Sequence, residues 1–372
     1  MKKPLIEQIR EEIIKHKTYQ VVKKSIPSEE TDPLNIFGLT GGISRKINHK
    51  ILKKDTLSFL KKFSPTAYKN LESMSETEKI LQMSVYEKFI AIILSYERTG
   101  KITFRVREKF SELLSKTDFP ENIGLNQIAF PFPGFFLEIE GSYIEYIEEE
   151  GHKINEGLIY ISVKKEEPNV YFSLNMIEES EGKFIVPWSV DVELKETDTL
   201  LCLFNKLVEE NKKKQIESKK IGEIIGILSN KEEIKEIEKI HEKIKENVRT
   251  LINLILYINH INEDIIDISP VPEKLKQKRD YYQKLKNEKK IEKIESQLKI
   301  YPRVYLVGQK TSEIVEREIK TAGSPKRPHW RRGHIRYYDP EKERKRKFKK
   351  QWTFVRPTLV KGKTEEAKEY VL

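Results

Sequence analysis

Between residues 134 and 190 the chain is built from short segments in which apolar residues alternate with polar ones or run together. These segments are separated by glycine, proline, asparagine and acidic residues; they read GFFLEIEG, SYIEYIEE, GLIYISVK, NVYFSLNMI and KFIVPWSV. The alternation is typical of β-strands that cover one face and expose the other. Their content of Ile, Val, Phe and Tyr also favours strands. The region therefore predicts four or five strands of a mostly antiparallel sheet.

The sequence on both sides of these strands has helical spacing. Residues 4–24, 48–63 and 76–98 carry apolar residues at intervals of three and four, which predicts amphipathic helices. Residues 25–47 hold two prolines and three glycines, and they predict a long connection. Helical spacing returns over 197–265. The helices are expected to cover the sheet.

The last part of the chain changes character again. Residues 269–299 predict a linker with a charged helix, and YPRVYLVGQ (301–309) predicts a strand. We therefore predict an α+β fold in four parts. These are an N-terminal helical region (1–125), a central, mostly antiparallel β-sheet flanked by helices (126–196), a helical Lys/Glu-rich segment (197–300) and a C-terminal basic β-hairpin module (301–372).

Composition narrows the class of protein. Charged residues form 35% of the chain, and its most apolar stretch, 251–268, is broken by Asn, His and acidic residues, so no membrane span is predicted. Cys202 is the single cysteine, which excludes an internal disulfide and fits a reducing cytosol. It lies in the apolar run TLLCLF and is expected to be buried. We expect a cytoplasmic protein.

The positive charge is concentrated at one end of the chain. Residues 326–363 hold 15 Lys and Arg against three acidic residues, a balance of +12, whereas the whole chain has +11, so all other residues sum to −1. A general preference for lysine would spread the charge evenly. The asymmetry therefore indicates a polyanionic partner for the C-terminal module.

The motif RPHWRRGHIRYYD (327–339) allows several kinds of site. His329 and His334 have no cysteine nearby and arginines between them, so we predict neither a metal nor another cofactor. The same two histidines could serve as general acid and base of a metal-independent ribonuclease, with arginines holding the phosphate. Nothing else in the chain offers a matched acid–base partner at recognisable spacing. A binding protein is therefore favoured over an enzyme.

Nucleic-acid binding would use most of the motif. Basic side chains would neutralise phosphates and tryptophans would stack on unpaired bases; the candidates are Arg327, Arg331, Arg332, Arg336, Lys345, Arg346, Trp330 and Trp352. Other residues would fix the backbone or orient it by hydrogen bonds, namely Pro328, His329, Gly333, His334 and Pro357. The alternative is a structural hairpin whose aromatic residues form a small core while its basic residues face water.

The C-terminal segments RPHWRRGHIRYY and QWTFVRPTLVKGK resemble the hallmark of a known family. It is the second described group of type V-A anti-CRISPR proteins, with relatives in phages and plasmids. The family pattern is RPH-x-RRGH-x-x-x-Y/W, then a variable basic loop and a strand with tryptophan and proline. Weaker matches follow in order over about residues 80–363, and Tyr338 stands where the family often has tryptophan.

The resemblance implies a mobile-element protein that acts in the host cytoplasm. It would block production of a type V-A CRISPR effector by recognising a segment of the nascent effector chain, or of another nascent polypeptide, with loss of the messenger RNA. The body would hold the peptide, and the basic module would contact RNA or the ribosome. Aromatic residues near the sheet, which would equally suit a plain core, are our prediction for the peptide site: Phe132, Phe135, Phe136 and Trp188.

Overall fold

The computed structural model describes residues 4–44, 49–63, 68, 76–128, 130, 132–140, 154–180, 183–224, 245–246, 248–261, 264–321, 329–331, 333–337, 352–355 and 358–360. The helices are α1 (Leu5–Ile13), α2 (Lys17–Ser25), α3 (Pro33–Ser44), α4 (His49–Phe63), α6 (Glu76–Arg98), α7 (Glu108–Ser115), α8 (Leu200–Ile224), α10 (Glu273–Lys284), α11 (Glu288–Leu298) and α12 (Gln309–Thr321), with a 3-10 turn η1 (Leu125–Gln127) and a π-helical turn η3 (Tyr257–Ile261). The strands are β1 (Ile102–Val106), β2 (Thr117–Asp118), β3 (Gly134–Glu140), β4 (Ile154–Glu166), β5 (Asn169–Ser180), β6 (Lys183–Lys195), β7 (Ile265–Asp267), β8 (Arg303–Val307), β9 (His329–Arg331), β10 (Gly333–Tyr337), β11 (Trp352–Val355) and β12 (Thr358–Val360).

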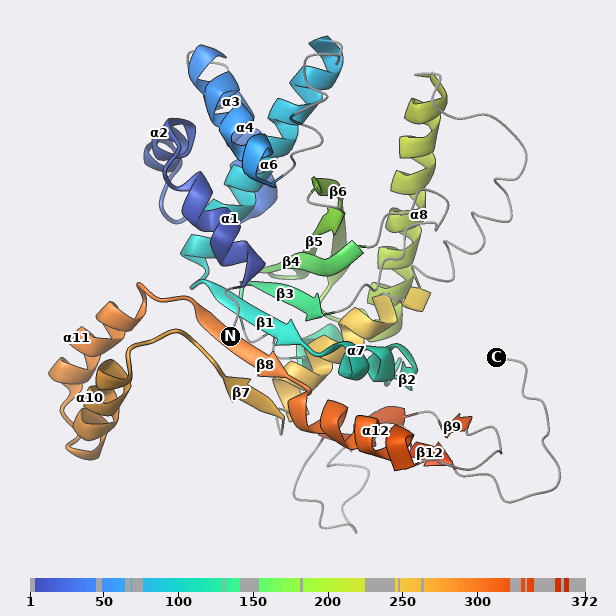
Figure 1. The fold of residues 1–372 in the computed structure, drawn as a ribbon. Coiled ribbons are helices and arrows are strands. Elements are labelled where there is room, and N and C mark those ends of the chain that lie inside the picture. Colours follow the sequence, from blue (N-terminus) through green and yellow to red (C-terminus); the bar gives the residue numbers. More distant parts are fainter. Residues whose placement is uncertain are drawn as a thin grey trace.

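A seven-stranded sheet in the order β6-β5-β4-β3-β1-β8-β7 forms the centre of the molecule (Figure 1). Strands β3 to β6 are an antiparallel meander, as their alternating sequence predicts. Strand β1 is parallel to both β3 and β8, and β7 closes the edge antiparallel to β8. The α+β class is confirmed. Each of the four predicted parts contributes at least one strand, so they share this sheet.

Each face of the sheet is covered by its own core. Successive side chains of a strand point to opposite faces. On β1, Ile102, Phe104 and Val106 therefore belong to the core shared with α7, α8 and residues 248–258. On β3, Phe136 points the other way, into the core formed with α1, α2, α3, α4 and α6. Figure 1 shows these helices gathered on that side of the sheet.

The N-terminal helices differ from the prediction at two places. The predicted helix over 4–24 is two helices, because His16 is extended and its Nδ1 lies 2.7 Å from the buried Tyr86 hydroxyl. The predicted connection over 25–47 contains the helix α3. Pro33 suits a first helical turn, where its missing N–H removes no hydrogen bond, and Ile36 is buried in the core. Burial thus outweighs the low helix propensity of the three glycines.

Three further predictions concern the predicted sheet, Cys202 and a membrane span, and the structure bears on the last two. The segment SYIEYIEE lies outside the described residues. Cys202 is exposed on α8, so its predicted burial is wrong: the helical face of Leu203 and Leu207 is the buried one. Within the described parts of the chain, no helix is both long enough and apolar enough to span a bilayer.

Helices α10 and α11 form a helical hairpin, called here the arm (residues 273–299), which projects from the body of the molecule (Figure 1). Helix α10 buries none of its residues, and α11 buries Ile294 and Leu298. The base of the arm is fixed to β8 at one end and to Lys101, the residue before β1, at the other. Val304 donates its N–H to Ser269 Oγ at 2.9 Å, and Lys101 Nζ donates to the carbonyl of Ile300 at 3.0 Å.

Candidate functional site

The C-terminal motif forms an antiparallel hairpin that is joined to the body. Strand β9 pairs with β12 and β10 pairs with β11. Arg331 lies opposite Thr358 and His334 opposite Val355, three residues further along on both strands, so the two pairings keep one register. Strand β10 also pairs in parallel with β2. The hairpin therefore forms a sheet with β2 of the body.

One face of this hairpin packs into the body. Ile335, Tyr337, Trp352 and Phe354 alternate onto it, and Phe354 contacts the rings of Phe110 and Tyr257. Trp352 is only 7% exposed, and its ring stacks on His260 with centroids 4.3 Å apart. The predicted role of Trp352 in stacking on bases is corrected accordingly, because a buried ring has no free face. Burial also lowers the pKa of His260, which favours its neutral form at this contact.

The other face of the hairpin points away from that core. It carries His334, which is half-buried, together with the exposed Arg336 and Val355. Arg336, which the sequence predicts to bind phosphate, therefore has its side chain on the surface. Of the remaining predicted residues, His329, Trp330 and Arg331 lie on β9 and Gly333 begins β10. The others lie outside the described residues: Arg327, Pro328, Arg332, Lys345, Arg346 and Pro357.

The hairpin geometry weighs against a catalytic pair of histidines. His329 lies on β9 and His334 on β10, five positions further along the chain. An extended chain rises by about 3.3 Å per residue, so five residues of extended chain span roughly 16 Å. A general acid and a general base must both reach one phosphate within hydrogen-bond distance. Within the described residues, moreover, no three His, Cys, Asp or Glu side chains are grouped so as to hold a metal ion.

The aromatic residues predicted to hold a peptide do not form one surface. Phe135 and Phe136 are adjacent on β3, so they point to opposite faces, and both are fully buried in the two cores. Phe132 is half-buried and packs against Phe104, with ring centroids 6.2 Å apart. Trp188 lies on β6, opposite Met176. Phe135 and Phe136 are core residues, and the prediction that they contact a peptide is corrected.

A pocket of 460 Å³ opens instead between α1, the β1–β8 part of the sheet and the base of the arm. Its wall is mostly apolar, with Glu7, Arg10, Glu11 and Arg105 as the charged members. The apolar lining comes from the residue before α1, from β8 and from the segments at both ends of the arm: Pro4, Ile268, Pro270, Ile300, Tyr301, Pro302 and Val304. Segments that are about 300 residues apart in the chain thus meet at one site.

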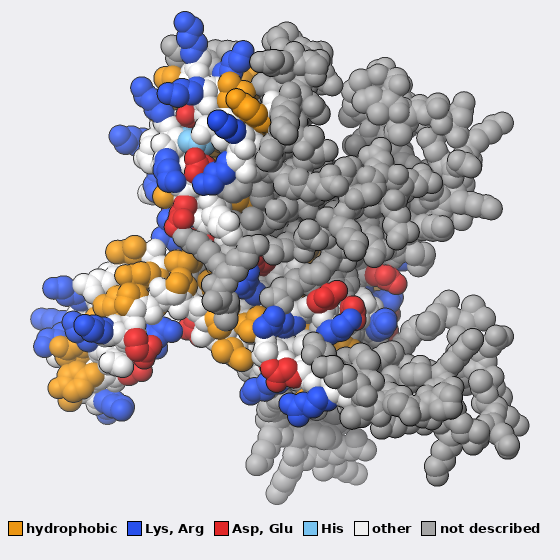
Figure 2. Space-filling model, in the orientation of Figure 1, with side chains coloured by type: hydrophobic (Ala, Val, Ile, Leu, Met, Phe, Trp, Pro, Cys, Tyr) orange, Lys and Arg blue, Asp and Glu red, His pale blue; other side chains and the backbone are white. Residues whose placement is uncertain are grey.

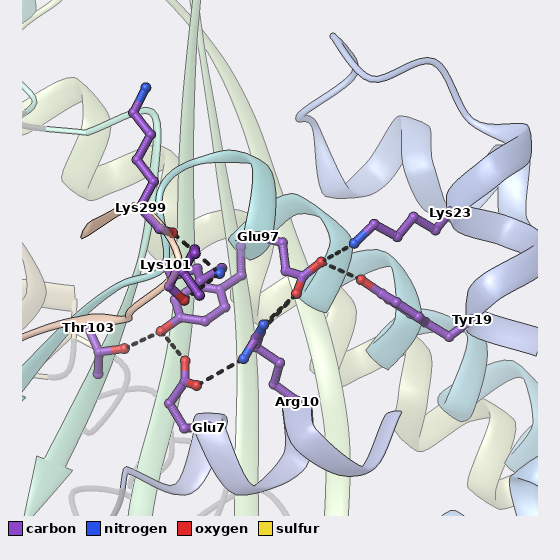
Figure 3. A network of polar contacts seen from close by, with 10 residues as sticks. Glu7, Arg10, Tyr19, Lys23, Glu97, Lys101, Thr103 and Lys299 are labelled. Carbon is purple, nitrogen blue, oxygen red and sulfur yellow. Dashed lines mark hydrogen bonds and ion pairs between the residues drawn. The ribbon is translucent and has the colours of Figure 1, made fainter. Parts of the chain in front are cut away.

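Two charged residues of the pocket wall, Glu7 and Arg10, are held in a polar network (Figure 3). Arg10 donates to Glu97 Oε1 at 2.9 Å and lies 3.3 Å from Glu7 Oε2. Tyr96 donates its hydroxyl to Glu7 Oε1 at 2.9 Å. Glu97 also accepts from Tyr19 at 2.6 Å and from Lys23 at 2.8 Å. The network fixes α1 and α2 against α6.

The network keeps Glu97 ionised. Burial by itself would raise the pKa of Glu97, but hydrogen bonds from Lys23, Tyr19 and Arg10 outweigh it and lower that pKa to about 2. At neutral pH the Glu97 carboxylate is therefore charged, and the Arg10 guanidinium at the pocket wall is matched by two carboxylates.

Arg105 is held in the same way by the sheet. Its Nε and Nη2 atoms donate to the two carboxylate oxygens of Glu138 on β3 at 2.7 and 3.1 Å. Both side chains are buried, so the ion pair is bidentate and largely removed from water. The pocket therefore combines apolar lining with Arg10 and Arg105 that are already paired, which suits a largely apolar ligand.

Sequence reasoning missed this pocket. Its lining comes from residues 4–11, 105, 268–270 and 300–304, and no spacing in the chain connects those segments. The pairing of β1 with β8 places residue 105 beside 300–304, and the hydrogen bonds of Glu7 and Arg10 to α6 hold α1 against them. The prolines at the two ends of the arm, two in SPVP and one in YPR, are a local signal of an ordered base, but not of a pocket.

Comparisons with known proteins agree with the C-terminal motif. A family model described as AcrVA2-like, the anti-CRISPR type V subtype A2 family, matches residues 104–362. This range covers more than half of the chain. The protein is therefore of the anti-CRISPR class, and it belongs to the AcrVA2-like anti-CRISPR type V subtype A2 family. The resemblance inferred from RPHWRRGHIRYY is confirmed.

Among solved structures, a crystal structure of AcrVA2 aligns over 95% of this chain and 96% of that chain, with 10% sequence identity and a TM-score of 0.40. No curated protein matches the chain. Membership of the family supports an anti-CRISPR function and an interaction with a component of a CRISPR system.

Proposed function

We propose that this protein is a binding protein that recognises a polypeptide segment of a type V-A CRISPR effector as the effector is made, and thereby causes loss of its messenger RNA. The pocket between α1, β8 and the base of the arm is the proposed peptide site. The observation that carries the proposal is the lining of that pocket, in which apolar side chains surround charged groups that already have partners.

The size and chemistry of the pocket support a peptide ligand. Pockets that hold drug-sized ligands measure about 300–1,000 Å³, and 460 Å³ accommodates a few side chains. Because Arg10 and Arg105 are ion-paired, a strongly charged ligand would have to break those pairs. An extended segment with apolar side chains requires no such break, and it would bury Ile300, which is 67% exposed.

The basic C-terminal module is the proposed contact with RNA or with the ribosome. Its hairpin has one face in the core and presents Arg336 on the other. The balance of +12 over residues 326–363 would attract a polyanion in a salt-dependent way. Peptide recognition by the pocket and polyanion attraction by the module would together place the protein at a translating messenger.

The peptide site can be tested with a set of overlapping peptides that cover the effector sequence. Each peptide is labelled and titrated with the intact protein by fluorescence anisotropy. We expect one or a few largely apolar segments to bind. Replacing Ile300 by aspartate should weaken that binding by about tenfold or more, because a carboxylate would be desolvated against the apolar wall.

The matched control is Leu39→Asp, which changes another exposed aliphatic residue, on α3 and away from the pocket. It should leave peptide affinity unchanged. Equal loss in both variants, or unaltered binding in Ile300→Asp, would contradict the pocket assignment. A companion assay follows effector messenger levels in cells that translate the effector, and the same Ile300→Asp variant should fail to lower them.

A further inference from the structure

We propose that the arm is a second RNA-binding element, which contacts single-stranded RNA through the exposed face of α10. This inference goes beyond peptide recognition by the pocket and does not depend on it. It rests on the charge, the exposure and the side-chain types of residues 273–299.

The arm carries a local excess of positive charge. Residues 273–299 contain ten Lys and Arg against five acidic residues, a balance of +5. With +12 in residues 326–363 and +11 overall, the rest of the chain sums to −6. The charge of the arm is therefore a property of this segment and not of the average composition. In Figure 2 the lobe formed by the arm shows Lys and Arg side chains beside hydrophobic ones.

Helix α10 has no buried side chain, which is unusual because a surface helix normally packs one apolar face on the core. Helical spacing instead places Lys274, Lys278, Tyr281 and Leu285 along one exposed stripe. Tyr281 and Leu285 are 58% and 56% exposed. A face of lysines and an open aromatic ring offers phosphate contacts and a stacking surface together.

The tyrosine pair supports a nucleic-acid ligand over an acidic polypeptide. The rings of Tyr281 and Tyr282 meet edge to face, 5.2 Å apart, and the ammonium of Lys290 lies 4.7 Å from the Tyr282 ring centre. Tyr282 is thus held in place by α11, while the ring of Tyr281 is open to solvent. Such a ring can stack on an unpaired base, whereas the carboxylates of an acidic peptide would not stack on it.

The arm is built as a rigid element. Asn287 N–H donates to the carbonyl of Tyr282 at 3.1 Å, which closes the C-terminus of α10. The side chain of Asn287 then accepts from Lys290 N–H at 3.2 Å and caps α11. With one end of the arm bonded to β8 and the other to Lys101, the lysines of α10 are displayed on a preorganised surface.

The test measures binding of the intact protein to a labelled single-stranded RNA of about 20 nucleotides, and to a duplex of the same length, at several salt concentrations. Changing Lys274, Lys278 and Lys284 together to glutamine removes three exposed charges from α10. The slope of log affinity against log salt should fall by about 2, since each phosphate contact with a single strand contributes about 0.7. This change in slope is expected even while the C-terminal module also binds.

The matched control changes three exposed lysines of α4, Lys53, Lys54 and Lys61, to glutamine. It alters the net charge equally and should leave the slope unchanged. Tyr281→Ala should weaken binding to the single strand by about fivefold or more and leave duplex binding unaltered, because only unpaired bases stack. Circular dichroism would show that every variant keeps its helix content.

Three results would overturn the proposal. An equal decrease of the slope in the α10 and α4 variants would show that RNA is attracted diffusely by the net charge. A slope that stays at the wild-type value in both variants would assign the RNA contact to the C-terminal module alone. Binding of poly-glutamate as tight as that of RNA would identify an acidic polypeptide as the partner. Peptide titration of the same variants separates this result from the pocket, because the α10 changes should not affect peptide affinity.

Discussion

Replacing Glu97 by glutamine tests how the N-terminal helices are held to the sheet. Glu97 accepts from three groups on α1 and α2, and its pKa is lowered to about 2 from an ordinary value of 4.5. A difference of roughly 2.5 units at about 1.36 kcal/mol per unit corresponds to a contribution of about 3 kcal/mol to folding near neutral pH. The side chain is 11% exposed, so solvent screening is modest.

The sign of the pH dependence follows from the lowered pKa. Because the folded state binds the Glu97 proton more weakly than the unfolded chain does, the contribution is complete above about pH 4.5 and is lost as the pH falls toward 2. The difference in unfolding free energy between wild type and Glu97→Gln should therefore be about 3 kcal/mol at pH 7 and less than about half of that at pH 3. Urea denaturation at both pH values measures it.

A matched control is Glu121→Gln, which neutralises an exposed carboxylate outside the network. It should change the unfolding free energy by less than about 0.5 kcal/mol at either pH. The reasoning would be refuted if Glu97→Gln were as stable as wild type at pH 7, or if its deficit were the same at pH 3. In the second case the loss would reflect packing of the side chain and not its charge.

Three further substitutions test other parts of the fold by the same denaturation assay. Arg105→Met leaves Glu138 buried without its cation and should cost about 3–5 kcal/mol, whereas the double change Arg105→Met with Glu138→Leu should recover most of that loss. Trp352→Ala should lower the unfolding free energy by about 3–5 kcal/mol, because it removes a buried ring that stacks on His260 and leaves a cavity. A small effect would show that the hairpin is not part of the core. Gly308→Ala should cost more than about 1 kcal/mol, since Gly308 has a φ of +80° and a Cβ there would collide with the Phe110 ring; a neutral result would contradict this backbone geometry.

Local patterns predicted the parts of the fold that local chemistry determines. The meander β3 to β6 follows from alternating apolar residues joined by short connections, and α6 follows from its long helical stripe. Helix α3 did not follow, because its glycines and Pro33 suggest a loop when read without the neighbour against which the helix packs. The insertion of β1 and β8 as parallel neighbours also depends on contacts about 200 residues apart.

The predicted sites show the same division. The motif RPHWRRGHIRYY was sufficient to indicate the family and the place of the basic module. The predicted aromatic peptide site included core residues, since a run such as GFFLEIE does not say which of its rings remains open to a ligand. The same limit applies to Trp352, which the sequence predicted as a base-stacking residue. Trp352 and Phe354 alternate with Thr353 and Val355, and this alternation indicates a buried face.

The sequence by itself thus determined the strand-forming segments, the family and the concentration of charge near the C-terminus, because these depend on residue types and short spacings. The tertiary structure decided the pocket, the pairing of Arg105 with Glu138 and the ionisation of Glu97. The physical reason is that burial and electrostatic partners come from segments far apart in the chain, and only strand pairing and helix packing in the folded protein bring those segments together.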